Sequence, residues 1–236
     1  MDIQDFLNSG ERYFLPNLSL DFVIIGYENS KLKCLLLKNN DQWFLPGGFV
    51  RKNQSVSDAA NEILHLRTKI ENPHFKFLDV FGDVNRTFSH EWKLFCEKNG
   101  YSWNQELWVN KRFISLAHYA LVDIKNSTPT VSFFDEDFYW FEMNNLPNMG
   151  LDHEHIVKRA KKQLQEDVKH NMVTHNLLPR QFTMPQLHKL HQIILEEKLD
   201  RSRFQKKMLA SGLYDRLPEL QKETPGRNPY LYQIKE

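Results

Sequence analysis

The cysteines and histidines of this sequence do not show the spacing of a metal site. Its 236 residues include two cysteines, Cys34 and Cys96, which are too few for a cysteine zinc site or a disulfide framework. The ten histidines show no regular ligand spacing; His153 and His155, two residues apart, would not share one helix face. We therefore expect no metal site, no cofactor and no catalytic residue, and we interpret Cys34, within an apolar run, as a core residue.

Basic side chains gather toward the C-terminal end of the chain. From Arg180 onward there are 11 Lys and Arg against 7 Asp and Glu, whereas the remaining residues hold 20 against 23 and the whole chain has a net charge of +1. Five of these cations are candidates for DNA contacts, namely Arg201, Arg203, Lys206, Lys207 and Arg227. If these cations lie on one face of the folded protein, they can contact the phosphates and base edges of DNA. If they do not, they are ordinary solvent-exposed surface charges.

The elements that must position these cations are two short helices and a hairpin. Residues 183–186, Thr-Met-Pro-Gln, form a capping box with proline in the first turn, which indicates a helix start. A second helix begins near Asp200 and ends at the Ser-Gly pair 211–212. A hairpin with its tip at 224–227 follows. This order is typical of winged helix-turn-helix modules, in which the second helix enters the major groove of DNA.

The chain before this segment has the pattern of a mixed α/β unit. Apolar runs predict two adjacent strands at 18–26 and 32–37, and further strands at 75–81, 113–124 and 136–141. The Pro-Gly-Gly at 46–48 predicts a strong break, followed by a helix capped by Ser55 or Ser57. A long helix is expected from Asp152 to about Lys169, because apolar residues recur there at steps of four. Residues 90–110 have the composition of a polar, aromatic insertion.

The start of a Nudix box resembles residues 45–51, Leu-Pro-Gly-Gly-Phe-Val-Arg, and the helix predicted after them. The pattern of the box is Gly-x5-Glu-x7-Arg-Glu-U-x-Glu-Glu-x-Gly-U, where U is a bulky aliphatic residue. Counted from the second glycine, the metal-binding Glu-Glu pair falls on Leu66 and Arg67. A shift of one residue brings Glu62 onto a glutamate of the pattern but puts His65 and Leu66 at the pair. Magnesium needs hard oxygen ligands, so neither register provides a metal site, and we expect no hydrolysis.

Further segments resemble Nudix-related transcriptional regulators, and with the box they cover nearly the whole chain. In chain order they are 81–86, Asp152-His153, 176–179, 182–183 and 200–209. This family includes repressors of NAD biosynthesis that sense ADP-ribose-type nucleotides, and Bacteroidetes regulators of sugar utilisation, one of them responsive to arabinose. The resemblance implies a Nudix-fold unit that senses an effector and dimerises. The insertion departs from the family pattern.

We accordingly expect an α/β fold in two domains. Residues 1–175 would form a Nudix-type α/β/α sandwich with a mixed sheet, and residues 176–236 a winged helix-turn-helix domain. The effector, a sugar or an ADP-ribose-like molecule, would bind near Phe49, Arg51 and Arg86.

Two of these features have alternative interpretations. Arg86 has an equally good interpretation as a loop-stabilising residue, paired for example with Asp83. The 90–110 insertion would be either a lid over the effector pocket or a dimer contact.

The predicted function is ligand-responsive repression of transcription by a cytoplasmic homodimer bound to a palindromic operator. No signal peptide or membrane-spanning run is expected, because the N-terminus is acidic and the apolar runs are short. Two alternatives remain. One is a Nudix pyrophosphohydrolase that acts on ADP-ribose or related nucleoside diphosphate derivatives with carboxylates from outside the box. The other is a module whose winged helix docks a protein partner.

Overall fold

A long strand, β1 (Phe14–Glu28), lies at the centre of the main sheet. The computed structural model describes residues 2–70, 74–132, 134–171, 174–221 and 228–235. β1 forms an antiparallel hairpin with β2 (Lys31–Asn39) and runs parallel to β6 (Ile114–Leu121), so the sheet is mixed, as predicted. The strand order is β5-β6-β1-β2-β3, with β4 paired to β1 and β7 to β2. The other strands are β3 (Gln42–Phe44), β4 (Gly47–Arg51), β5 (Phe75–Phe81) and β7 (Asp137–Glu142).

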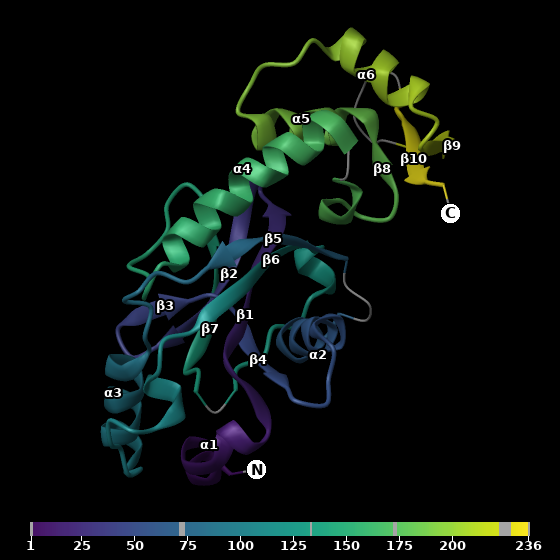
Figure 1. Cartoon of the computed structure of the whole chain (residues 1–236). Coiled ribbons are helices and arrows are strands. Elements are labelled where there is room, and N and C mark those ends of the chain that lie inside the picture. Colours follow the sequence, from purple (N-terminus) through teal and green to yellow (C-terminus); the bar gives the residue numbers. More distant parts are fainter. Residues whose placement is uncertain (1, 71–73, 133, 172–173, 222–227, 236) are drawn as a thin grey trace.

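Helices α2 (Val56–Thr68) and α4 (His153–Asn171) cover opposite faces of this sheet (Figure 1). Alternation along β1 explains both layers, because successive side chains of a strand point to opposite faces. Phe22 and Ile24 pack with the apolar face of α2, whereas Val23 and Ile25 belong to the core that includes α4. The predicted α/β/α sandwich is confirmed.

Local signals place the helix ends and faces where the sequence predicts them. Ser55 is the N-cap of α2, with its side chain accepting a hydrogen bond from the Asp58 backbone N–H at 3.1 Å. Helix α4 begins directly after Asp152, and its residues at steps of four are buried, namely Ile156, Ala160, Leu164 and Val168. No helix in the described part of the chain combines the length and hydrophobicity of a membrane span.

The C-terminal segment forms the predicted winged helix-turn-helix. Helix α5 (Met184–Leu195) begins with the complete capping box of Thr183 and Gln186, and Asp200 caps α6 (Arg201–Ala210). Strands β9 (Tyr214–Glu219) and β10 (Tyr230–Ile234) form the hairpin, and β10 also pairs with the short β8 (Phe182–Thr183). The predicted hairpin tip, including Arg227, lies outside the described residues.

One continuous apolar core joins the sheet to the winged helix. It runs from Val23 and Leu36 through the buried face of α4 to Leu187 of α5 and Phe204 of α6. Polar contacts reinforce the junction: Lys161 pairs with Glu196 at 2.6 Å. The domain boundary expected between residues 175 and 176 stays a prediction, because described residues from both sides of it belong to the same core.

Two short helices that the sequence analysis did not expect stand at the other end of the sheet. Helix α1 (Ile3–Ser9) packs with α3 (Ser89–Asn99), and the short turns η1 (Gly10–Arg12) and η2 (Trp108–Asn110) lie beside them. The polar, aromatic insertion thus contains most of helix α3, and its Trp92 and Trp108 are buried in an aromatic cluster with Phe6 of α1. The remaining helical turns are η3 (Ile124–Asn126) and η4 (His175–Leu177).

The break expected at 46–48 lies earlier in the chain: residues 45–46 separate β3 from β4, and β4 begins at Gly47 itself. A Cβ on Gly47 would lie 2.6 Å from the Leu20 carbonyl oxygen and 2.6 Å from Asp21 Oδ1. A Cβ on Gly48 would lie 2.9 Å from the Ile63 side chain of α2. The two glycines therefore allow β4 to approach β1 and α2 closely, rather than ending the strand structure.

Candidate functional site

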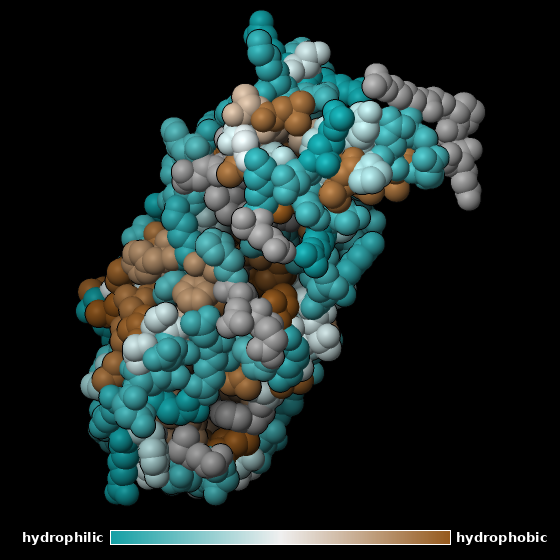
Figure 2. Space-filling model, turned by 90° about the vertical axis from the view of Figure 1, so that its right-hand side faces the viewer, coloured by the Kyte–Doolittle hydropathy of each residue, from teal (hydrophilic) through white to brown (hydrophobic). Residues whose placement is uncertain are grey.

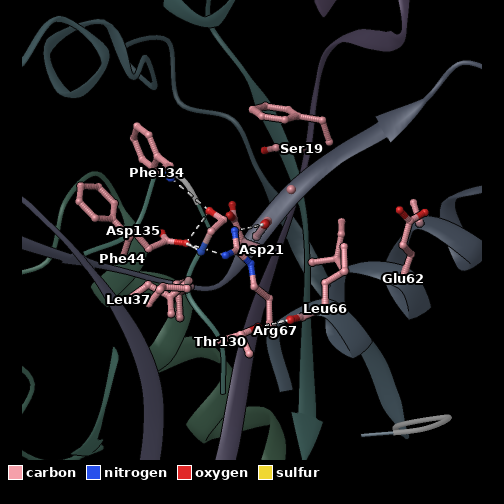
Figure 3. Close-up of a pocket in the computed structure, with 18 of the residues that line it drawn as sticks. Ser19, Asp21, Leu37, Phe44, Glu62, Leu66, Arg67, Thr130, Phe134 and Asp135 are labelled. Atoms are coloured by element: carbon pink, nitrogen blue, oxygen red, sulfur yellow. Dashed lines mark hydrogen bonds and ion pairs between the residues drawn. The ribbon is translucent and has the colours of Figure 1, made fainter. Parts of the chain in front are cut away.

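A cavity of about 550 Å³ lies where the degenerate Nudix helix α2 meets β1 and β4 (Figure 3). Its volume is within the usual range for small-molecule sites. Seven aromatic rings contribute to its lining, namely Phe6, Phe14, Phe44, Phe49, Phe88, Trp92 and Phe134. The polar side chains of the lining come from β1, the end of β4, Gln54, α2 and Lys69 after it, the segment 130–135 and the first residue of α4. A cavity that combines aromatic rings with polar side chains is suited to a ligand that carries both a ring and hydrogen-bonding groups.

Arg67 occupies one position of the expected metal-binding pair and forms an internal ion pair. Its Nη1 lies 2.5 Å from Asp135 Oδ2, and its Nη2 donates to the Gly47 carbonyl oxygen at 3.3 Å. Ser132 also donates to the same Asp135 oxygen, through its backbone N–H at 3.0 Å and its hydroxyl at 2.8 Å. Figure 3 shows this pair beside Asp21, with Leu66 and Glu62 farther along α2. A fixed guanidinium thus faces the cavity.

Glu62, the acidic side chain of the box, is engaged by neighbouring side chains. Its carboxylate lies 2.6 Å from Arg51 Nη1 and accepts a hydrogen bond of 2.6 Å from the Gln54 side chain. The hydrogen bond from Arg51 lowers the pKa of Glu62, so this carboxylate is ionised at neutral pH. Gln54 stands at the first glutamate position of the Nudix pattern and contributes an amide there.

These side chains do not fit the magnesium that the Nudix fold implies. Leu66 is half exposed and has no ligand atom, Arg67 is a cation, and Glu62 is already paired with Arg51. Within the described residues, no three His, Cys, Asp or Glu side chains come together in a group that could hold a metal ion. Magnesium bound by protein carboxylates therefore has no donor set at this box.

Arg86 has partners that the sequence analysis did not identify. It contacts Asp83 only through the backbone, and its guanidinium is buried against two other carboxylates. Nη2 donates to Asp21 Oδ2 at 2.7 Å, and Nε donates to Asp152 at 3.0 and 3.2 Å. Arg86 thereby links β1 to the start of α4.

The three predicted effector residues separate in the structure. Phe49 and Arg51 line the cavity, whereas Arg86 does not and lies behind Asp21. Its role as a ligand residue stays a prediction. Sequence reasoning also missed the cavity residues Asp21 and Asp135, which no local pattern distinguishes. Of the 90–110 insertion, Trp92 lines the cavity, and the choice between a lid and a dimer contact stays a prediction.

Helix α6 presents the four predicted basic side chains to solvent. Arg201, Arg203, Lys206 and Lys207 are all exposed, whereas Phe204 and Met208 are buried in the core. In the part of the chain that the structure describes, none of these four cations forms a salt bridge with a carboxylate. They are therefore available to an anionic partner. Figure 1 places α6 at the end of the molecule opposite α1 and α3.

This architecture defines a class of proteins in which a Nudix-type sandwich is joined to a winged helix-turn-helix domain. Residues 174–234 match the NrtR DNA-binding winged helix domain. The chain is 22% identical over 226 residues to the ADPR responsive transcriptional repressor NtrR of Acinetobacter baylyi, and the match covers 92% of this chain and 81% of that one.

Two solved structures share the fold. The Shewanella oneidensis NrtR complexed with a 27mer DNA is 20% identical, with a TM-score of 0.73 over 92% of this chain and 93% of that one. A MutT/nudix family protein from Enterococcus faecalis is 18% identical, with a TM-score of 0.68 over 100% and 94% of the two chains. Residues 174–234 thus form an NrtR-type winged helix domain, and the chain shares its fold with Nudix-type proteins, in agreement with the resemblance of its sequence motifs to Nudix-related transcriptional regulators.

Proposed function

We propose that this protein is a DNA-binding repressor of transcription that acts in the cytoplasm and responds to a small molecule bound by its Nudix-type unit. The observation that carries the proposal is the match of residues 174–234 to a DNA-binding winged helix domain whose second helix exposes four cations that form no salt bridge within the described part of the chain. In helix-turn-helix proteins the second helix lies in the major groove, where such cations contact base edges and phosphates. The partner that we propose is double-stranded operator DNA.

Helix α6 is the proposed recognition helix. Arg201 and Arg203 are in its first turn, the part that contacts base edges in such modules, whereas Lys206 and Lys207 follow one turn later. We assign base contact to Arg203 and phosphate contact to Lys207. Arg227, on the wing, is proposed to reach the DNA backbone or minor groove.

The proposed effector is a sugar or a sugar nucleotide of the ADP-ribose type. The Acinetobacter baylyi relative is ADPR responsive, which favours a nucleotide and genes of NAD metabolism. The cavity itself favours a ligand of low charge, because its three cations, Arg51, Arg67 and Lys69, are matched in number by the three lining carboxylates Glu62, Asp135 and Asp21, and Glu62 and Asp135 pair directly with Arg51 and Arg67. That property supports a neutral, arabinose-like sugar and control of sugar metabolism as the second candidate.

We propose that effector binding is not followed by hydrolysis. The residues at the box offer no metal donor set, and the guanidinium of Arg67 is held by Asp135 at the position of a metal-binding glutamate. A Nudix pyrophosphohydrolase acting on ADP-ribose is the enzyme alternative, and it would require carboxylates from elsewhere. The third possibility, a winged helix that docks a protein, predicts no affinity for DNA.

The proposed assembly is a homodimer that presents two α6 helices to a palindromic operator. An edge strand with apolar side chains is available for such an assembly. β5 ends the main sheet, and apolar side chains on it and next to it are exposed, namely Phe77, Val80, Val84 and Ile114. Figure 2 shows hydrophobic side chains gathered along the left edge of the molecule at the level of the central sheet. Light scattering on the purified protein measures the assembly directly.

Binding to DNA from upstream of the gene and its neighbours tests the DNA-binding proposal. Arg203→Ala is expected to cost about 1–3 kcal/mol on the specific site, the usual value of one bidentate base contact. Lys207→Ala should weaken binding to all sequences alike and lower the salt slope by about one. Lys93→Ala, on α3 at the far end of the molecule, is the matched control. Wild-type affinity in both α6 variants, with their fold intact, would exclude α6 from the interface.

A further inference from the structure

The inner end of the cavity contains three buried polar side chains from two elements. Ser19 and Asp21 are alternate residues of β1 and therefore point to the same face of the sheet. His153 is the first residue of α4. All three line the cavity, and their exposed fractions are 4% for Ser19, 4% for Asp21 and 1% for His153.

His153 directs an N–H group toward this end of the cavity. Its Nδ1 accepts a hydrogen bond from the Leu45 backbone N–H at 2.9 Å, so the neutral ring carries its proton on Nε2. Burial lowers the pKa of His153, which keeps the ring neutral at physiological pH. Nε2 has no hydrogen-bond partner among the described residues, because the nearest carboxylate oxygen, Asp21 Oδ1, is 3.9 Å away.

Ser19 and Asp21 complete a mixed set of donors and acceptors. The Ser19 hydroxyl is buried and has no partner within the described chain. Asp21 uses Oδ2 to accept hydrogen bonds from Arg86 at 2.7 Å and from Ser115 at 2.5 Å, and its Oδ1 faces His153. Buried polar groups without partners are unfavourable, so a ligand atom that satisfies them gains affinity and specificity.

The charges at this end of the cavity select the kind of ligand atom. Asp21 and Asp152 bring two negative charges and Arg86 one positive charge, while His153 is neutral, so the local formal charge is −1. A phosphate oxygen would be repelled by this excess of negative charge. A carbonyl oxygen accepts from His153 but has no proton to donate to Asp21. A hydroxyl group does both.

Aromatic side chains complete the recognition of a ring that carries such a hydroxyl. Phe44 contacts the His153 ring edge to face at 5.7 Å between centroids, and Phe88 lies 6.4 Å from it. Both line the cavity and offer apolar surface to the C–H groups of a sugar ring.

We propose that Ser19, Asp21 and His153 form a subsite that binds a hydroxyl group of a sugar ring and so fixes the effector against the first residue of α4. This inference rests on the proposed function of the cavity as the effector site. The hydroxyl is common to a free sugar and to the ribose units of ADP-ribose. Because His153 begins the helix that packs on the winged helix, occupancy of the subsite acts directly on the element that joins the two parts.

Calorimetric titration of the full-length protein with L-arabinose, and separately with ADP-ribose, tests the subsite. In His153→Asn the side-chain oxygen takes the place of Nδ1 and accepts from Leu45, while the Nε2–H is lost. Binding of whichever probe the wild type binds should weaken at least about tenfold in His153→Asn and in Ser19→Ala. His118→Asn is the matched control, because His118 is also buried but does not line the cavity. The affinity of this variant for the probe should stay within about twofold of the wild-type value.

Each outcome decides a separate question. Binding of arabinose alone identifies a free sugar, and binding of ADP-ribose alone identifies a nucleotide sugar; either supports the subsite if the two variants lose affinity. Ser19→Ala, which removes a single hydroxyl, carries the test if His153→Asn does not fold. Unchanged affinity in the folded variants, or a wild type that binds neither probe at millimolar concentration, overturns the subsite. Operator binding is measured separately, and its absence would instead refute the proposed repressor.

Discussion

Removing the guanidinium of Arg86 should destabilise the protein strongly. The variant Arg86→Met keeps a side chain of similar length but deletes the cation between β1 and α4. The Arg86 side chain is 1% exposed, and its carboxylate partners Asp21 and Asp152 are 6% and 20% exposed. Three charge-assisted hydrogen bonds of 2.7 to 3.2 Å disappear with it. The two carboxylates then lie close together, desolvated and without a counter-charge.

The expected loss is about 3–5 kcal/mol of unfolding free energy, the usual cost of removing one partner from a buried ion pair. That is a large share of a typical total of about 5–15 kcal/mol. Adding Asp21→Asn to the variant should restore part of the loss, because it removes one of the two uncompensated charges. The control is Arg159→Met on α4, whose ion pair with Asp79 is solvent-exposed and should contribute no more than about 1 kcal/mol.

Urea unfolding at neutral pH, followed by circular dichroism, measures these differences. The same titrations separate a structural Arg86 from one that contacts the effector. A loss below about 1 kcal/mol in Arg86→Met, no larger than the Arg159 control, would refute the reasoning, since it would mean that the two carboxylates do not need this cation.

Three further predictions concern acid stability, coupling and catalysis. Burial lowers the pKa of His191 in the winged helix to about 4, so the stability that the neutral ring contributes is complete above about pH 6.5 and is lost as the pH falls toward 4. Unfolding titrations of the wild type should show this loss of up to about 3 kcal/mol, and those of His191→Leu should not. A flexible glycine insertion after Asn176 should leave effector affinity nearly intact but abolish its influence on DNA affinity, and an insertion variant that responds like the wild type in operator titrations would contradict this. No magnesium-dependent release of AMP from ADP-ribose is expected, because Leu66 and Arg67 hold the metal-ligand positions; robust turnover that a chelator abolishes would disprove it.

Periodicity and capping made the framework predictable from the sequence. The apolar steps of four in α4 and the capping box at Thr183 are local signals, and the structure confirms both. The unpredicted N-terminal helix carries a comparable local signal, since Asp2 caps α1 and Phe6 and Leu7 are its buried residues. Helices and strands that are determined by residues close together in the chain can therefore be predicted from the sequence.

The site depended on contacts between distant parts of the chain. Arg86 meets Asp21 and Asp152, which are 65 and 66 residues away from it in sequence, and Arg67 meets Asp135 across 68 residues. No local pattern predicts such pairs. The glycines at 47–48 were misinterpreted for the same reason, because the need for them arises from the approach of β4 to β1 and α2 rather than from the backbone of the turn.

Helix α4 acts as a lever between the cavity and the DNA-binding surface. Its 19 residues span about 28 Å at about 1.5 Å per residue. If its first turn stays fixed to β1 through Arg86, a tilt of about 7° displaces the far end by about 3.4 Å, the distance between successive base pairs of B-DNA. The continuous core makes the winged helix follow α4 as one body. A hydroxyl bound at His153, next to this pivot, therefore has to change only the tilt of α4 to move α6 out of phase with the groove.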